Sequence, residues 1–423
     1  MNLLYNTGIR AYALGARVFA LRNAKANRMV KGQKQTMERL RQALQPGKKY
    51  VWVHAASLGE FEQGRPFIER LRREKPEYGV VLTFFSPSGY EVRRNYAGAD
   101  VVCYLPFDTP RRAKKFIETV NPAMAVFVKY EFWGNYLKEL KRRNIPTYII
   151  SAIFRPTQPF FKWWGGMFRQ MLACYRTIFV QDSRSAQLLS SIGVRNNVIV
   201  AGDTRFDRVT DILNTTVEMP AVEKFTAGAP LTIVFGSSWP QDEELYAPWL
   251  KAHPEVKAII APHEFDEGRL EALRHTGAGK GVMLSELDAD ADACKDAQVL
   301  VVNCFGKLSS LYRYGQVAYV GGGFGEGIHN VNEAAVYAMP VLFGPKHKKF
   351  KEATDLIACG GGFTFTNRAE LEALLDMMLE DGGKRMSAGA KAGEYIERNL
   401  GATDKAFKEI YCCPIKLFEA RKD

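Results

Sequence analysis

From Tyr50 onward, short runs of β-branched and aromatic residues alternate with amphipathic helical stretches, and this alternation constrains the fold more than any other feature. It is the pattern of parallel βαβ units, because each helix returns the chain to the same end of the sheet. Helices such as 60–73 and 183–192 separate the candidate strands. The strands predicted before residue 205 are 50–54, 80–84, 101–105, 124–128, 147–150, 177–180 and 198–201.

The alternation stops at residues 205–230, where Pro220, Gly228 and Pro230 interrupt a stretch without a strong strand signal. We interpret this stretch as a linker between two domains. The pattern restarts, with strands predicted at 231–235, 258–261, 282–284, 299–302, 317–320 and 341–343, and residues 367–410 are expected to be helical.

The chain is therefore expected to be α/β, with two Rossmann-like, doubly wound parallel-sheet domains that face each other across a cleft. Its 423 residues exceed what one core usually organises. The predicted divisions are a basic N-terminal segment (1–49), a first domain (50–204), the linker (205–230), a second domain (231–400) and a last helix (401–423) that crosses back to the first domain.

A glycine-rich run at 321–327 follows the predicted strand 317–320 and precedes a helix expected to reach Ala338. Gly322 and Gly323 let the backbone approach a ligand closely, and a helix N-terminus attracts phosphate. The spacing matches neither a dinucleotide fingerprint nor a P-loop. A nucleotide site is favoured, with Asn330, Asn332 and Glu333 as hydrogen-bonding groups, although a purely structural turn would give a similar pattern.

Two carboxylates follow strands of the first domain. Ser57 and Gly59 are expected in a tight turn, and Glu60 begins the next helix. Glu131 follows the apolar strand 124–128. Each carboxylate is either an acid favoured by the helix dipole or a catalytic group at the mouth of the cleft.

Two further segments could contact a phosphate. Gly236, Ser237 and Ser238 follow the first strand of the second domain and could offer hydroxyl and N–H groups, although helix capping explains them almost as well. Arg205, near the linker, could place a cation beside a leaving phosphate, or it could be an ordinary surface residue.

No metal site or cofactor is expected. The six histidines lack metal-ligand spacing, and the acids Asp288, Asp290 and Asp292 lie in an alanine-rich connection that we interpret as a solvated loop. The seven cysteines form no C-x-x-C pair, which favours reduced thiols.

The net charge of +12 is concentrated at the N-terminus, where residues 1–49 carry eleven Lys and Arg against the single acid Glu38. A basic segment beside the apolar residues 3–21 favours an anionic membrane surface over nucleic acid. Arg10 and Arg17 make a clean span costly, so we expect an interfacial helix with Leu3, Leu14, Val18 and Leu21 toward lipid. A buried N-terminal helix is the alternative.

Five segments together resemble the 3-deoxy-D-manno-octulosonic acid (Kdo) transferases of lipopolysaccharide synthesis: 56–60 (ASLGE), 131–133 (EFW), 202–207 (GDTRFD), 236–238 (GSS) and 322–333 (GGFGEGIHNVNE). The resemblance covers most of the chain. It implies a GT-B glycosyltransferase that transfers Kdo from CMP-Kdo to a lipid A precursor, lipid IVA, with inversion and without metal. It also implies a location at the cytoplasmic face of the bacterial inner membrane.

The resemblance assigns roles by position. It implies that Glu60 is the catalytic base and that Glu131 and Arg205 stabilise the transition state. It implies contacts to CMP from Pro262, His263, Gly306, Lys307, Leu308, Asn330, Val331, Asn332 and Glu333. The alternatives are another GT-B enzyme that uses a UDP-sugar, either a transferase or an epimerase, and a non-catalytic basic protein that binds membrane or nucleic acid.

Overall fold

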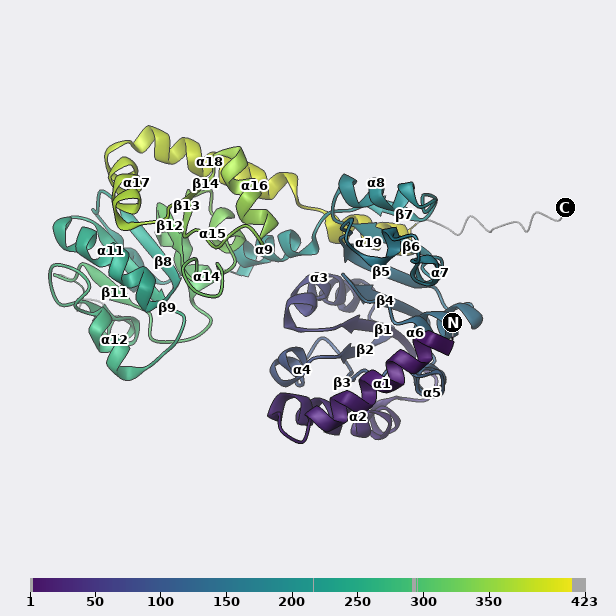
Figure 1. Cartoon of the computed structure of the whole chain (residues 1–423). Helices are drawn as coiled ribbons and strands as arrows, with labels where there is room; N and C mark the ends of the chain where they lie inside the picture. Colours follow the sequence, from purple (N-terminus) through teal and green to yellow (C-terminus); the bar gives the residue numbers. More distant parts are fainter. Residues whose placement is uncertain (1–2, 216, 291–293, 295, 413–423) are drawn as a thin grey trace. The chain divides into compact units, whose positions relative to one another are not determined.

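The structure is a computed structural model that describes residues 3–215, 217–290, 294 and 296–412. The chain divides into two compact units (Figure 1). Unit 1 comprises Met1–Arg208 and Leu400–Asp423, and unit 2 comprises Val209–Asn399. The chain therefore enters unit 2 once and returns to unit 1 for its last segment.

Unit 1 is built on seven parallel strands in the order β3-β2-β1-β4-β5-β6-β7. Alternate residues of β1 enter two hydrophobic clusters, one containing Trp52 and the other Val53, so both faces of the sheet are covered. Every strand predicted in this part of the sequence is present, to within two residues at each end. The strands are β1 (Lys49–Ala55), β2 (Tyr78–Phe84), β3 (Val101–Tyr104), β4 (Met124–Val128), β5 (Thr147–Ala152), β6 (Thr177–Val180) and β7 (Val198–Val200).

The crossover helices of unit 1 are α3 (Leu58–Glu74), α4 (Pro87–Arg93), α5 (Pro110–Val120), α6 (Gly134–Arg142), α7 (Gly166–Leu172), preceded by the 3-10 turn η1 (Pro159–Phe161), and α8 (Ser183–Ser191). The returning segment forms α19 (Ala402–Tyr411), which packs on α3. The ring centroids of Phe67 and Phe407 are 5.9 Å apart, and Arg70 pairs with Asp404 at 2.9 Å.

The N-terminal segment also belongs to unit 1, as helices α1 (Leu3–Phe19) and α2 (Ala24–Ala43). Helix α2 packs on the sheet, where the hydroxyl of Thr36 donates to the carbonyl of Tyr104 at 2.7 Å. The hydroxyl of Tyr5 on α1 donates to Asp108 at 2.6 Å. The segment therefore combines the two predicted alternatives, because α2 is packed while α1 is largely exposed.

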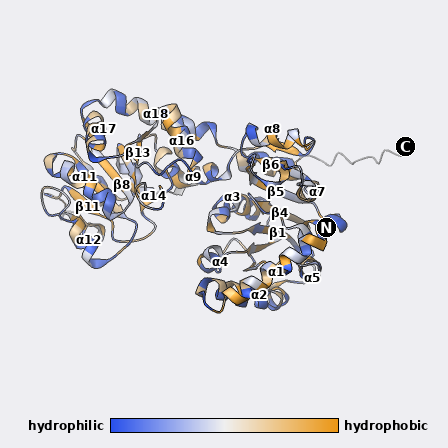
Figure 2. Cartoon of the chain, viewed as in Figure 1, coloured by the Kyte–Doolittle hydropathy of each residue, from blue (hydrophilic) through white to orange (hydrophobic). Residues whose placement is uncertain are grey.

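The apolar side chains predicted to face lipid are exposed, three of them on α1 and Leu21 just after it. Figure 2 shows apolar and polar residues alternating along this helix. The exposed fractions are 82% for Leu3, 62% for Leu14, 61% for Val18 and 82% for Leu21. Within the described residues, none of the helices has the length and apolar character needed to cross a membrane.

Unit 2 contains a second parallel sheet, in the order β10-β11-β9-β8-β12-β13-β14. Six of its strands were predicted, and β14 was not, because three residues beginning with glycine give almost no strand signal. The strands are β8 (Thr232–Ser238), β9 (Lys257–Pro262), β10 (Val282–Met283), β11 (Val299–Val301), β12 (Val317–Val320), β13 (Val341–Phe343) and β14 (Gly362–Thr364).

The helices of unit 2 are mostly short, apart from α11 and the last two. Those two confirm the helical character expected for residues 367–410. The helices are α10 (Pro220–Thr226), α11 (Pro240–Ala252), α12 (Glu267–Leu273), α13 (Leu284–Ala289), α14 (Leu308–Leu311), followed by the 3-10 turn η3 (Tyr312–Tyr314), α15 (Asn332–Ala335), α16 (Lys351–Cys359), α17 (Arg368–Glu380) and α18 (Gly382–Arg398).

The stretch interpreted as a linker is more ordered than the sequence suggested. Helix α9 (Thr204–Thr215) contains the division between the units, and α10 packs within unit 2 through the buried side chains of Val222 and Phe225. Pro220 begins α10, a position where the missing N–H has no partner in any helix. The proline that suggested a loop is therefore a helix start.

Candidate active site

The candidate residues follow the strands at which each sheet reverses its strand order. In unit 1 the order reverses between β1 and β4, and in unit 2 between β8 and β12. Ligands of open α/β sheets bind at the carboxyl ends of the strands beside such a switch point. Glu60 and Glu131 follow β1 and β4, and the glycine-rich run follows β12.

Glu60 lies in the first turn of α3, with its side chain 17% exposed. The hydroxyl of Ser57, the residue that precedes the helix, donates to Oε2 of Glu60. The ammonium of Lys129 lies 3.9 Å from Oε1. The turn predicted at Ser57 and Gly59 is instead a helix start, because Gly59 is already the second residue of α3.

Glu131 is buried, and one of its carboxylate oxygens lies beside two ring nitrogens. Its Oε2 accepts from Nε1 of Trp133 at 2.5 Å and lies 3.0 Å from Nε2 of His54. His54 is fully buried, and its Nδ1 lies 2.8 Å from the hydroxyl of Thr83. Nδ1 also lies 3.1 Å from the carbonyl oxygen of Thr83, and Nε1 of Trp133 lies 3.1 Å from Nε2 of His54, so the tautomer of His54 decides whether Nε2 donates to Glu131. His54 and Trp133 thus fix the position of the carboxylate.

Arg205 lies beside Asp203. Its Nε and Nη2 donate to Oδ2 of Asp203 at 2.9 and 2.8 Å, and Gln63 donates to Oδ1 at 3.0 Å. Burial raises the pKa of Asp203, but the charge and hydrogen bonds of Arg205 outweigh burial and leave the pKa below its ordinary value. Arg205 is therefore a held cation, since Asp203 fixes one face of its guanidinium.

Tyr130 connects these groups electrostatically. Burial raises the pKa of its hydroxyl, and the charges that act on it next are those of Arg155, Glu60, Arg205 and Asp203. The contacts agree, because Glu60 and Gln63 both lie on α3 and Gln63 donates to Asp203, the partner of Arg205. The predicted residues Glu60 and Arg205 therefore lie in one neighbourhood of unit 1. Glu131 adjoins Tyr130 in the chain.

The sequence did not single out every residue of this neighbourhood. His54, Tyr130, Arg155 and Asp203 were given no role. A signal was present for one of them, since His54 is a polar residue inside the apolar strand β1, where an unpaired imidazole would be costly. The others depend on contacts between segments far apart in the sequence.

The glycine-rich run of unit 2 is a turn held by a buried carboxylate. Gly322 has φ of +90°, a conformation that disfavours side chains, and a Cβ there would lie 2.5 Å from the carbonyl of Gly327. The N–H of Gly322 donates to Asp242 at 3.0 Å, and the hydroxyl of Tyr319 donates to the same carboxylate at 2.8 Å. Gly323 packs directly on Gly344. Packing explains these glycines without a ligand.

Gly325 differs from its neighbours. A Cβ there would meet no atom closer than 3.8 Å. The helix expected after the run is also wrong in length, because α15 has four residues and Ala338 has φ of +53°. So short a helix adds little dipole, and a bound phosphate would depend on individual N–H groups instead.

Gly236, Ser237 and Ser238 are the last residues of β8, not a turn after it. Ser237 has φ of +53°, and the hydroxyl of Ser238 donates to Glu243 at 3.0 Å. Gly236 is required by packing, since a Cβ would lie 2.0 Å from the hydroxyl of Tyr312. The segment is built for close approach of β8 to η3.

Most of the residues assigned to CMP gather at the same edge of unit 2. Pro262 ends β9, and the N–H of His263 donates to Ser238 at 2.9 Å. The ring of His263 stacks on Trp239 and lies 4.5 Å from the ring of His329. Burial lowers the pKa of His329 to about 4, and the neighbouring His263 adds to the shift. The His329 ring in this stack is therefore neutral at pH 7.

The remaining assigned positions frame this stack. Gly306 has φ of +78°, Lys307 precedes α14, and Leu308 approaches Gly236. The amide of Asn330 donates to Glu333 at 3.0 Å, and Val331 is fully buried. Oδ1 of Asn332 is buried and has no hydrogen-bond partner among the described residues. An acceptor in that state is a candidate for a donor group from a ligand.

The described residues contain no group of three or more His, Cys, Asp or Glu side chains that could hold a metal ion. Of the acidic triplet in the sequence, Asp288 lies in α13 and Asp292 is outside the described residues.

The fold and the two switch-point sites define a GT-B architecture, that of nucleotide-sugar enzymes. Two solved structures have this fold, and their likeness shows the fold alone. MurG of Acinetobacter baumannii matches with a TM-score of 0.53 and 15% identity over 86% of this chain and 99% of that one. The UDP-GlcNAc 2-epimerase of Neisseria meningitidis matches with a TM-score of 0.54 and 14% identity over 83% and 99%.

The sequence comparisons name the family. Residues 31–208 match the family model of 3-deoxy-D-manno-octulosonic-acid transferases. The Kdo transferase of Aquifex aeolicus is 25% identical over 80% of this chain and 88% of its own length, and that of Bordetella pertussis is 26% identical over 85% and 86%. The chain is therefore similar to Kdo transferases over most of its length, and it is a glycosyltransferase.

Proposed function

We propose that this enzyme transfers Kdo from CMP-Kdo to a lipid A precursor, with inversion at the anomeric carbon. The observation that carries the proposal is the set of contacts in unit 1 that links Glu60 to Lys129, two residues before Glu131, and links α3 through Gln63 and Asp203 to Arg205. The similarity to Kdo transferases supports the sugar, since the relatives are named for Kdo transfer.

Glu60 acts as the general base in this proposal. A hydroxyl of the acceptor sugar attacks the anomeric carbon of Kdo from the face opposite CMP. Its proton passes to the carboxylate of Glu60 as the new carbon–oxygen bond forms. The bond between the anomeric carbon and the phosphate oxygen breaks, and CMP leaves with that electron pair. The bond from Ser57 and the nearby cation of Lys129 orient the carboxylate for this step.

Glu131 and Arg205 complement the charges that develop. Positive charge grows on the sugar ring, and a buried carboxylate fixed by His54 and Trp133 stabilises it without reorganising. Negative charge grows on the phosphate, which suits a guanidinium already oriented by Asp203. These steps are acid–base and electrostatic, so we expect transfer to need no metal ion.

Unit 2 holds CMP in this proposal. Asn330, Asn332 and Glu333 offer acceptors and donors to the ribose and base, and the buried, unpartnered Oδ1 of Asn332 supports a donor from the ligand. The segments at Gly306–Leu308 and Pro262–His263 lie at the same sheet edge and complete the site.

The acceptor is a lipid, and α1 suits a place at the membrane surface. Its exposed leucines and Val18 lie on the same helix as Arg10 and Arg17, a composition that favours the interface of an anionic bilayer. We propose that the enzyme works at the cytoplasmic face of the bacterial inner membrane, where residues 1–49 contact lipid.

One assay tests the proposal. The enzyme is incubated with CMP-Kdo and lipid IVA, with and without a chelator, and free CMP and the mass of the lipid are measured. We expect equal CMP release in both samples and a lipid heavier by Kdo. UDP-N-acetylglucosamine as the donor is the control and should give no product. Failure of the wild-type enzyme to modify the lipid would reject the proposed reaction.

A further inference from the structure

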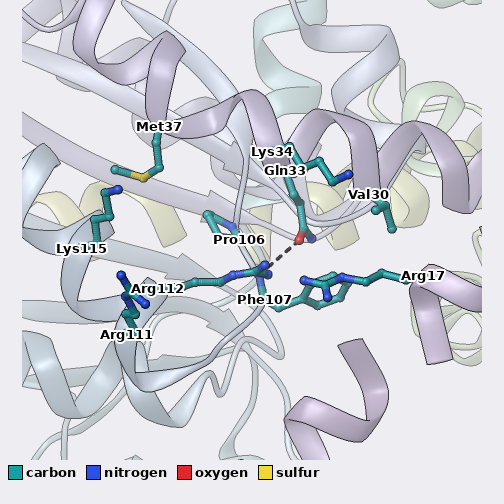
Figure 3. A pocket seen from close by; sticks show the side chains of 10 residues that line it. All are labelled: Arg17, Val30, Gln33, Lys34, Met37, Pro106, Phe107, Arg111, Arg112 and Lys115. Atoms are coloured by element: carbon teal, nitrogen blue, oxygen red, sulfur yellow. Dashed lines mark hydrogen bonds between the residues drawn. The ribbon is translucent and has the colours of Figure 1, made fainter. Parts of the chain in front are cut away.

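A pocket in unit 1, lined by none of the predicted site residues, is lined by five cations. It has a volume of about 370 Å³ and lies between α1, α2 and α5 (Figure 3). Its walls contain no acidic side chain. The basic residues that line it are Arg17, Lys34, Arg111, Arg112 and Lys115.

In the described part of the chain these cations lack acidic partners, although the guanidinium of Arg112 lies over the ring of Phe107, 5.8 Å from its centroid. Among the residues that the structure describes, none of the five forms a salt bridge. Figure 3 shows Arg17 and Arg112 extending toward one another from α1 and α5. Burial lowers the pKa of Arg112, and the like charge of Arg17 lowers it further. Concentrated like charge destabilises the unit unless an anion binds there.

A buried amide in the same wall also lacks a partner. Gln33 is 7% exposed, and its Oε1 accepts from the N–H of Phe107 at 3.2 Å. Its Nε2 is buried and has no hydrogen-bond partner among the described residues. An unpaired donor between five cations is complementary to an oxyanion, because phosphate oxygens accept several hydrogen bonds at once.

We propose that this pocket binds the phosphate monoester of a lipid headgroup. Phosphate is favoured over carboxylate because guanidinium groups from two helices can contact different oxygens of one tetrahedral anion. A lipid is favoured over a free anion because α1, which contributes Arg17, also carries the exposed Leu14 and Val18. Apolar side chains beside the pocket would contact acyl chains while the pocket contacts the headgroup.

The pocket adjoins the candidate active site through three aromatic rings. The ring centroid of Phe107, in the pocket wall, lies 6.0 Å from that of Phe85. The ring centroid of Phe85 lies 4.8 Å from that of Trp133, the donor to Glu131. At this position the pocket would bind a phosphate group of the acceptor lipid itself. That part rests on the proposed function, whereas phosphate binding does not.

The test compares binding to two kinds of vesicle. One contains phosphatidylcholine with phosphatidic acid, which has a phosphate monoester, and the other contains phosphatidylcholine with phosphatidylglycerol, which has a diester, at matched surface charge. We expect the wild type to bind the monoester vesicles more tightly by about fivefold or more, as for one additional charge-assisted hydrogen bond. Inorganic phosphate should remove this preference.

Two variants locate the effect. Arg112→Gln with Lys115→Gln should abolish the preference, whereas Lys25→Gln with Arg41→Gln, two exposed cations of α2 outside the pocket, should weaken binding to both vesicles alike. Gln33→Glu keeps an acceptor for the N–H of Phe107 but places a carboxylate among the cations. It should remove the preference without lowering the unfolding temperature.

Two outcomes would contradict the proposal, and a third separates it from the proposed function. An equal preference in the wild type and the pocket variant would show that the pocket does not read the monoester. Stabilisation by inorganic phosphate without any vesicle preference would assign the pocket to a soluble anion. A wild type that prefers monoester vesicles but fails to transfer Kdo would reject the proposed function and leave the pocket assignment standing.

Discussion

Both units contain a parallel seven-stranded sheet, but different kinds of residue follow the strands at which each sheet reverses its order. Unit 1 places ionisable side chains there, each fixed by a neighbour: Glu60 by Ser57, Glu131 by His54 and Arg205 by Asp203. Unit 2 places glycines, hydroxyls and stacked rings there. In the proposed function, the same fold thus separates proton transfer and charge stabilisation from ligand binding.

The first prediction tests this difference between the units with the substitution Glu60→Gln. The change removes the proposed base from unit 1 and leaves unit 2 untouched, so kcat should fall by about 10²- to 10⁴-fold while CMP affinity stays the same. Turnover is measured by CMP release, and affinity by calorimetric titration of CMP.

Glu62→Gln is the matched control, because Glu62 lies on the same helix and pairs with Arg93 at 2.7 Å at the surface. It should change kcat by no more than about twofold. Retained turnover in Glu60→Gln would reject the base assignment, and loss of CMP binding would show that the units do not divide the work in this way.

The second prediction concerns Asp108, a fully buried carboxylate of unit 1. Burial raises its pKa to about 6, although bonds from Tyr5 and from the N–H groups of Asn135 and Tyr136 act in the opposite direction. Between pH 4 and 6 the folded chain holds a proton that the unfolded chain has lost. Stability from this group is therefore present at pH 4 and is lost as the pH rises through 6, by up to about 3 kcal/mol.

Asp108→Asn should remove that decline, measured by urea unfolding at several pH values. Asp100→Asn is the control. Burial raises the pKa of Asp100, but its bond from Lys48 and further contacts outweigh burial and lower it, so that carboxylate contributes no decline in this window. An unchanged slope in Asp108→Asn would mean that another group of unit 1 titrates there.

The strands were predictable because buried parallel strands appear as continuous apolar runs bounded by turns. The early end of the helix expected to reach Ala338 was not predictable. Its alanine-rich sequence favours a helix, whereas Pro340 and the entry into β13 end the helix early. Local sequence cannot show which of two competing preferences the tertiary structure will select.

The candidate site was predictable where a residue stands next to its own strand, as Glu60 and Glu131 do. His54 and Asp203 were missed because their importance arises from partners distant in sequence: His54 contacts Thr83 and Glu131, and Asp203 contacts Gln63. The cationic pocket was also missed, since the N-terminal charge was visible but the gathering of α1, α2 and α5 around it was not.

The third prediction separates structure from binding within unit 2. Gly322→Ala should destabilise unit 2 by about 1 to 3 kcal/mol, because alanine is strained at φ of +90° and meets the carbonyl of Gly327. Gly325→Ala should leave stability nearly unchanged, since the space is open, but should weaken CMP binding if the nucleotide approaches that backbone. Hydrogen exchange of β12 and CMP titration measure the two effects. If Gly325→Ala changes neither, the whole run is a structural turn.

The last prediction, with the smallest expected effect, concerns His329 of unit 2. It tests whether the ring stack of unit 2 is neutral, in contrast to the ionised side chains of the candidate site in unit 1. Burial, and then His263, lower the pKa of His329 to about 4. Between pH 4 and 6.5 the unfolded chain binds a proton that the folded chain does not, so stability rises with pH across this window and is complete above it. The group is partly exposed, so solvent screening reduces the contribution to about 1 kcal/mol.

His329→Gln should remove this rise in stability, which is measured by hydrogen exchange of unit 2 corrected for the intrinsic exchange rate. In the wild type, the imidazole signal of His329 followed by NMR should titrate near 4. A midpoint near 6.5 would place a cation in the stack at mildly acidic pH, and the contrast between a charged unit 1 and a neutral unit 2 would fail at this residue.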